Sequence, residues 1–371
     1  YQFGMGGSMT MLPDAVENTV GNSEVTWEKV RKQNYGIDLK MFGARLSLTA
    51  DYFFEHRYDI LSTRNTLPSI VAIELPLINL GEVDNRGYEI SLGWNSRTEK
   101  IDWWVQGNVS YSKNKIIFMD EVMPNYPWMA QTGRSTGLNY GYRFDRFLRA
   151  DDFDADGALK TDGEGKPLLP VMSLGSPRPG DALFKDLNGD GKIDGNDKTY
   201  FGYSQRPDYV LGLLGGFRYK NFEISMQWTA GLHASRMLSG EYRNAFGSTN
   251  GRALLKFLAD GRWTPENLDA RFPRLTFLNK SHYLEDSDLW LMDGSYLRLK
   301  VAEIGYTFRD IPAFRKVGVK SLKVYFSGYN LLTLFSDLND IDIDPEGATS
   351  GSNIDSYPNV RIFNFGVNIT F

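Results

Sequence analysis

The sequence predicts an all-β fold, part of a large antiparallel transmembrane β-barrel with long extracellular loops. Three observations predict it. Several segments alternate apolar and polar residues, connections alternate between short and long, and no apolar run reaches the roughly 18 residues of a membrane helix. Glycine, at 37 of 371 residues, and aromatic residues, at 14%, suit a protein with many turns and with rings at membrane interfaces.

The last residues show the alternation most clearly. Residues 363–371 read Phe-Asn-Phe-Gly-Val-Asn-Ile-Thr-Phe, so a strand would place apolar side chains on one face and polar or small ones on the other. A soluble sheet edge rarely exposes such an uncharged apolar face, whereas in a membrane barrel this face meets lipid and the polar face meets a wet lumen. We therefore expect the closing strand of an outer-membrane barrel here.

Other segments repeat this pattern, and about nine spanning strands are expected. Their predicted ranges are 24–42, 45–61, 83–97, 101–113, 208–219, 222–234, 289–308, 321–332 and 358–371. In one of them the apolar phase switches between Val301 and Ile304, which predicts a β-bulge at that point. A soluble β-sandwich or propeller is the alternative, but long strands joined by loops of many tens of residues fit it poorly.

The connections orient the chain. Short turns are expected at 43–44, 97–100 and 220–221, and long segments at 62–82, 114–207, 235–288 and 333–357. Bacterial barrels have short periplasmic turns and long outer loops, so 114–207 should be an outer loop region and Phe371 should end on the periplasmic side. Such barrels have an even number of strands, so an odd count indicates that 1–371 is the C-terminal part of a larger barrel.

Composition excludes several functions. The net charge of −5 argues against a nucleic-acid partner, and the absence of cysteine excludes disulfides, thiolate metal sites and a thiol nucleophile. No phosphate-binding glycine loop and no convincing catalytic nucleophile motif is present, so we expect no enzyme and no organic cofactor. A barrel enzyme of the protease or lipase type and a soluble calcium-dependent lectin or adhesin remain as alternatives.

Residues 186–197 match the twelve-residue calcium loop, with Gly191 at the sharp turn. The expected oxygen ligands are Asp186, Asn188, Asp190, the backbone carbonyl of Lys192, Asp194 and Asp197. The last ligand is Asp rather than Glu, and no amphipathic helix clearly flanks the loop, which indicates a Ca²⁺ loop on a β scaffold. The alternative is a turn that Asp, Asn and Gly form without metal.

A group of aromatic residues in the 114–207 region is a candidate for substrate binding, because flat rings stack on sugar faces or peptide side chains. The candidates are Tyr126, Trp128, Tyr140, Tyr142, Phe144 and Phe147. The alternative is that these rings pack loop against loop over the barrel mouth.

Several stretches are similar to those of one known family. They are 25–29 with 36–39, 79–89, 262–267, 293–300 with 305–307, 329–333, and the terminal Phe371. These stretches resemble the SusC/RagA family of TonB-dependent outer-membrane transporters from Bacteroidetes-type bacteria, and the loop at 186–197 also has counterparts there. The resemblance extends from about Trp27 to Phe371.

The resemblance implies a barrel of about 22 strands in outer-membrane lipid, an N-terminal plug absent from this chain, and Phe371 as an assembly signal. It implies import of an oligosaccharide or peptide, driven by the TonB–ExbB–ExbD complex through the N-terminal part. A SusD-like surface lipoprotein would close the barrel, and two transporter–lipoprotein pairs would form a dimer.

Overall fold

One large antiparallel sheet organises the chain. The computed structural model describes residues 21–66, 75–98, 100–246, 254–277, 281–309, 311–347 and 359–371, with a short pair of strands, β1 (Gln2–Phe3) and β2 (Thr10–Met11). In these residues the sheet has nine strands in the order β19-β18-β17-β14-β13-β6-β5-β4-β3. Its strands are β3 (Lys29–Met41), β4 (Leu46–Ser62), β5 (Ile78–Arg97), β6 (Ile101–Phe118), β13 (Tyr209–Tyr219), β14 (Phe222–Leu232), β17 (Tyr296–Arg309), β18 (Ser321–Leu334) and β19 (Ile362–Thr370).

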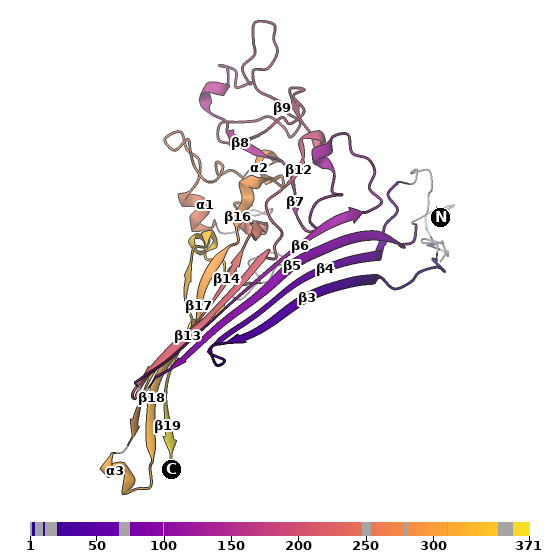
Figure 1. Ribbon diagram of the computed structural model, residues 1–371. Coiled ribbons are helices and arrows are strands. Elements are labelled where there is room, and N and C mark those ends of the chain that lie inside the picture. Colours follow the sequence, from indigo (N-terminus) through magenta and orange to yellow (C-terminus); the bar gives the residue numbers. More distant parts are fainter. Residues whose placement is uncertain are drawn as a thin grey trace.

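The short turns and the long connections lie at opposite ends of these strands (Figure 1). Phe42, Gly43 and Ala44 make the β3–β4 turn with positive φ angles, and Lys220, at φ 53°, begins the β13–β14 turn. The β17–β18 connection at the same end contains helix α3 (Pro312–Arg315). The predicted alternation of short and long connections between the strands is therefore confirmed for this sheet.

The long connections form what we call the loop layer, the described residues of 119–208, 233–295 and 335–361 (Figure 1). Its elements are η1 (Pro127–Met129), β7 (Asn139–Gly141), β8 (Phe144–Phe147), η2 (Ala150–Asp152), β9 (Val171–Met172), β10 (Ala182–Phe184), β11 (Lys192–Ile193), η3 (Gly195–Asp197), β12 (Thr199–Phe201), β15 (Ser235–Met237), η4 (Gly240–Tyr242), α1 (Lys256–Asp260), α2 (Ser281–Leu284), η5 (Asp288–Trp290), β16 (Leu291–Asp293) and η6 (Asp337–Ile341).

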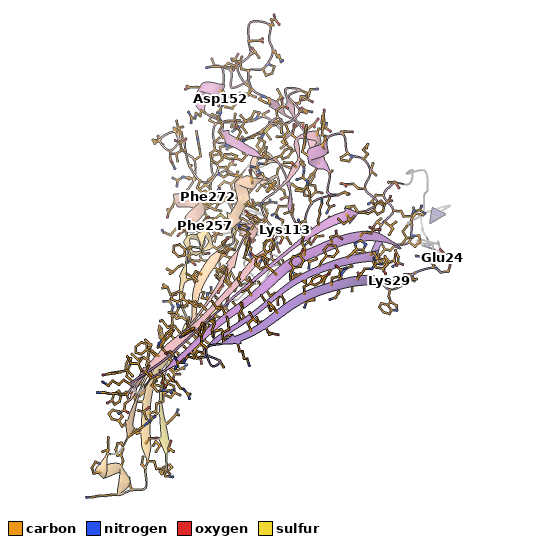
Figure 2. The ribbon with its side chains drawn as sticks, in the orientation of Figure 1. Glu24, Lys29, Lys113, Asp152, Phe257 and Phe272 are labelled. Carbon is orange, nitrogen blue, oxygen red and sulfur yellow. The ribbon has the colours of Figure 1, made fainter. Side chains whose placement is uncertain are left out.

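The loop layer has a hydrophobic core of its own, to which all three long connections contribute. Leu148 and Phe184 come from the first, Leu258 and Trp290 from the second, and Leu338 from the third, and all five are at most 2% exposed. Figure 2 labels Phe257 and Phe272 in the second connection, where their ring centroids lie 5.3 Å apart. These connections thus form a folded unit rather than separate loops.

The sheet has an apolar face and a polar face, as the alternation predicts. Five tyrosines stand in register across β3, β4, β5, β6 and β13 on the apolar face, at the end near the loop layer. They are Tyr35, Tyr52, Tyr88, Tyr111 and Tyr209. We call this line of side chains the tyrosine row.

A second group of rings stands on the same face near the short turns, where Trp94 and Trp103 stack with centroids 6.4 Å apart. On β6 the stretch from Trp103 to Tyr111 is about 27 Å long, or about 21 Å of membrane at a tilt of about 40°. This covers most of the apolar band of about 25 Å that outer-membrane barrels place between two aromatic girdles.

On the polar face, large rings lie close against glycines of the neighbouring strand. Trp104 covers Gly216, and Tyr325 covers Gly366, where an added Cβ would overlap the ring. Because glycine has no side chain, nothing at these positions holds the ring away from the backbone. At these places the surface of the polar face therefore lies closer to the backbone of the sheet.

The nine predicted strands are confirmed in the described residues, with shifted boundaries. The bulge lies at Lys300, where the pairing of β17 with both neighbours skips one residue, rather than between Val301 and Ile304. The predicted span 289–308 begins too early, because Leu291–Asp293 is a separate strand that pairs with β15 in the loop layer. Among the described residues no helix is long and apolar enough to cross a membrane.

Replacing Gly366 with Ala in the full-length protein should destabilise the barrel by about 1–3 kcal/mol, because the added methyl group displaces the Tyr325 ring. The midpoint of heat-induced unfolding, followed as a gel-mobility shift, should fall. The control is Asn364→Ala, on the same face of β19. Equal midpoints for the two variants would contradict this close packing.

Candidate functional site

The polar face of the sheet is the first part of the candidate site. Its side chains bond across strands: Thr49 donates to Asp38 at 2.6 Å, Ser112 to Asn85 at 3.0 Å and Asn34 to Asp51 at 3.2 Å. Near the short turns, Lys323 lies 2.8 Å from Glu303 on the next strand. These bonded polar groups suit a wall that borders water.

A polar hollow of about 890 Å³ lies where this face meets the loop layer. The wall contributes Glu55, Arg57 and Asn85, and the loop layer contributes Thr136 and Arg206. Both hydrogen-bond donors and hydrogen-bond acceptors line this hollow, so it suits a polar solute that can accept and donate hydrogen bonds.

The predicted calcium loop is an ordered turn in the loop layer. The Asp186 carboxylate accepts hydrogen bonds from the N–H groups of Gly189 and Gly191, and Asp194 accepts one from Asn196. Asp197 is fully buried and accepts from the Leu187 and Asp194 N–H groups. Burial raises the pKa of Asp197, and these hydrogen bonds only partly offset it.

The donor set partly fits a calcium ion. The side-chain oxygens at 186, 188, 190, 194 and 197 all belong to one turn, and carboxylate oxygens that accept one N–H keep further lone pairs. In the described residues, however, no three carboxylate or histidine groups are gathered in the arrangement of a metal site. Calcium binding therefore stays a prediction.

Two of the predicted aromatic residues pack directly on this loop. Tyr126 and Trp128 stack with ring centroids 4.5 Å apart and planes within 10°. The Trp128 indole N–H donates to the Asn196 carbonyl at 2.8 Å, and the Asn188 amide lies 3.3 Å from the Tyr126 hydroxyl. The structure thus joins two features that the sequence separates by about 60 residues.

The other predicted rings differ in accessibility. Tyr142 and Phe147 are each 4% exposed in the core of the loop layer, where the packing alternative places them, and they present no surface to a solute. Phe144 packs against the same core, whereas Tyr140 is exposed and contacts Tyr200 at 4.7 Å. Substrate contact by Tyr126, Trp128, Tyr140 and Phe144 stays a prediction.

A buried ion-pair cluster, which the sequence analysis missed, joins the wall to the loop layer. Arg298 on β17 is 4% exposed and lies 2.8 Å from both Asp344 and Glu346. Lys300, at the bulge, reaches Glu346 at 2.5 Å. The only local signal in the sequence is an arginine within the strand motif 293–300, since its partners lie more than 40 residues away.

A hollow of about 580 Å³ lies in the apolar face, bordered by Leu92, Leu213 and Trp228. Its lining is almost wholly apolar, and it opens on the side that the tyrosine row marks as facing lipid. It is therefore not part of the polar candidate site.

Replacing Arg298 with Ala should release the segment 336–347 from the wall, because it leaves two largely buried carboxylates with one cation fewer. Breaking a buried pair from one side typically costs about 3–5 kcal/mol. Hydrogen exchange of this segment in the full-length protein should rise. Lys256→Ala, which breaks an exposed pair with Asp260, is the control and should change nothing.

The same cluster predicts a pH dependence. Burial acts to raise the pKa of Asp344, but hydrogen bonds from Arg298 and the Glu346 N–H, with the charge of Arg298, outweigh it, so this pKa lies below its ordinary value. A carboxyl with a lowered pKa stabilises the fold above the ordinary value, and loses this contribution as pH falls through the lowered one. The protection factor of amides in 336–347, which compares their exchange rate with that of an unfolded chain at the same pH, should be unchanged from pH 8 to about pH 5. A fall in this protection already at pH 6 would contradict this assignment.

Comparisons with known proteins agree on the kind of protein. The TonB dependent receptor-like, beta-barrel family matches residues 3–331. TonB-dependent receptor P3 of Formosa agariphila is 30% identical over an alignment of 377 positions that covers 94% of this chain and 35% of that protein. TonB-dependent receptor SusC of Bacteroides thetaiotaomicron is 24% identical over an alignment of 382 positions that covers 100% of this chain and 34% of SusC.

Among solved structures, the RagAB peptide importer in its open-open state superposes with a TM-score of 0.67 and 20% identity, over 95% of this chain and 36% of that chain. This match shows a shared fold. The chain spans about a third of the length of the curated relatives it matches. The relatives are receptors and importers by name, in agreement with the expectation that the chain is not an enzyme. The chain belongs to the TonB-dependent receptor-like β-barrel family of outer-membrane transporters.

Proposed function

We propose that this chain forms part of the wall and the outer mouth of a barrel that imports an oligosaccharide or a peptide across the outer membrane. The polar hollow of about 890 Å³ between wall and loop layer supports this proposal most directly. It lies on the polar face, at the end of the sheet where the long connections gather, so a solute that enters a barrel would meet it first.

The folded loop layer supports a partner on the outer side. Its core fixes the long connections in one arrangement, and such a preformed surface loses little conformational entropy when a second protein binds. We propose a SusD-like surface lipoprotein as that partner, with two transporter–lipoprotein pairs in the assembly. The names of the relatives SusC and RagAB support this partner, and RagAB is a peptide importer.

The driving force is proposed from the family alone. TonB, with ExbB and ExbD, would act on segments outside the matched third of the relatives. The residues described here would bind and pass the solute.

The test is purification of the full-length protein from outer membranes in mild detergent, with mass spectrometry of what co-purifies. A stoichiometric surface lipoprotein with bound oligosaccharide or peptide is the expected result. A barrel that purifies alone, and whose deletion leaves growth on peptides and oligosaccharides unchanged, would contradict the proposal.

Residues 186–197 are proposed to bind one Ca²⁺, which would stiffen the stacked pair Tyr126–Trp128 that packs on this loop. Calorimetric titration of the full-length protein should detect this ion, and Asp186→Ala should remove it. Asp162→Ala is the matched control, because Asp162 makes a similar turn with N–H groups of Glu164 and Lys166 but lacks the twelve-residue spacing. Equal calcium uptake by both variants would contradict the site.

A further inference from the structure

Three cations gather on the apolar side of the wall just beyond the tyrosine row. Arg86 on β5 and Lys113 on β6 are register partners, and each lies two residues from the tyrosine of its strand, on the side of the loop layer. Lys115 stands two residues further along β6. All three side chains are exposed, and Figure 2 labels Lys113 where the strands meet the loop layer.

These cations line a hollow of about 490 Å³ that the loop layer roofs with Gly133, Ser135 and Tyr203. Within the described residues the side chains of Arg86 and Lys115 make no hydrogen bond or ion pair, and the Lys113 ammonium lies 3.9 Å from its nearest carboxylate, Asp208.

The fourth cation in this hollow is committed elsewhere. Arg134 donates to the Ala130 and Trp128 carbonyls. Of the two acidic residues in the hollow, Asp84 is bound to His56 at 2.7 Å, and Asp208 is the neighbour of Lys113. An anion would therefore find two cations whose side chains have no partner in the part of the chain that the structure describes, Arg86 and Lys115, and a third, Lys113, with its nearest carboxylate at 3.9 Å.

A second hollow continues on the other side of the tyrosine row. It is the apolar hollow of about 580 Å³, and Ile90 and Val109 border it two residues below Tyr88 and Tyr111. Gly107 forms part of its floor, where an added Cβ would meet only atoms 3.9 Å away. The missing side chain leaves room among the surrounding leucines.

The two hollows lie on the same face of the sheet. One is lined by cations, as suits a lipid headgroup, and the other mainly by apolar side chains, as suits an acyl chain. Tyrosine rings mark the level of the headgroups, so the cations lie at or just above that level and the apolar hollow lies among the acyl chains. Arginine and lysine bind phosphate through charge-assisted hydrogen bonds. We propose that a phosphorylated lipid of the outer membrane binds here, with its phosphate at Arg86, Lys113 and Lys115 and an acyl chain over Gly107.

The probe is phosphatidic acid, added to the delipidated full-length protein in detergent and counted by native mass spectrometry, with phosphatidylcholine for comparison. The protein should bind phosphatidic acid more tightly. Each cation near a membrane surface contributes about fivefold, so the R86Q/K113Q/K115Q variant should bind roughly 100-fold more weakly. The matched control, K160Q/K166Q/K185Q, removes three exposed cations of the loop layer and should bind like wild type.

The acyl hollow has its own test. Gly107→Leu should weaken binding about tenfold, because it fills the space of roughly two buried CH₂ groups. Gly215→Leu is the control and should have no effect, because Gly215 lies on the same face of the sheet, in the neighbouring strand β13, but outside the hollow. If the triple variant fails to assemble, R86K/K113R/K115R should assemble and keep the lipid.

Three results would overturn the proposal. Equal binding of the two lipids, or equal binding by the triple variant and its control, would exclude a phosphate site at these cations. Displacement of phosphatidic acid by 10 mM inorganic phosphate, taken as roughly physiological, would assign the site to free phosphate instead. None of these results bears on import, so the site and the proposed function fail independently.

Discussion

The two-sided strand is the constraint on which the rest of this structure depends. In a bilayer every backbone N–H and C=O must be bonded within the protein, so the sheet has to be continuous, and its alternate side chains must face lipid and water. The nine described strands meet this demand with one continuous antiparallel sheet. Once the faces are fixed, Tyr111 must lie on the lipid side and Ser110 on the polar side.

The loop layer follows a different rule, because water surrounds it and its backbone can turn freely. It is held by burial of large side chains such as Trp290, by the Arg298 cluster and by the fully buried Asp181, which binds Arg274 at 2.6 Å across two connections. The Arg298 cluster therefore joins this layer to β17. The hollow on the polar face lies between the layer and the wall.

Alternation in the sequence was enough to predict the strands and their two faces, because a strand's periodicity is local. It could not predict that Tyr142 and Phe147 are core residues, because burial in the loop layer depends on segments that lie more than 100 residues apart in the sequence. The bulge lies at Lys300, before the predicted interval between Val301 and Ile304, and the contact of Lys300 with Glu346 involves a segment more than 40 residues away, which the apolar phase does not reveal. The pairing of Tyr126 and Trp128 with the loop at 186–197 was equally invisible, although both parts had been identified separately.

The assignment of the two faces can be measured directly, because the sequence contains no cysteine. Single cysteines placed at Ser91, Asn108 and Ser110 on the polar face, and at Ile90, Val109 and Leu211 on the apolar face, would be treated with a charged maleimide in intact outer membranes. The account predicts labelling of the polar set alone, and labelling of the apolar set only after detergent is added. Equal labelling of both sets in membranes would contradict a wall between lipid and lumen.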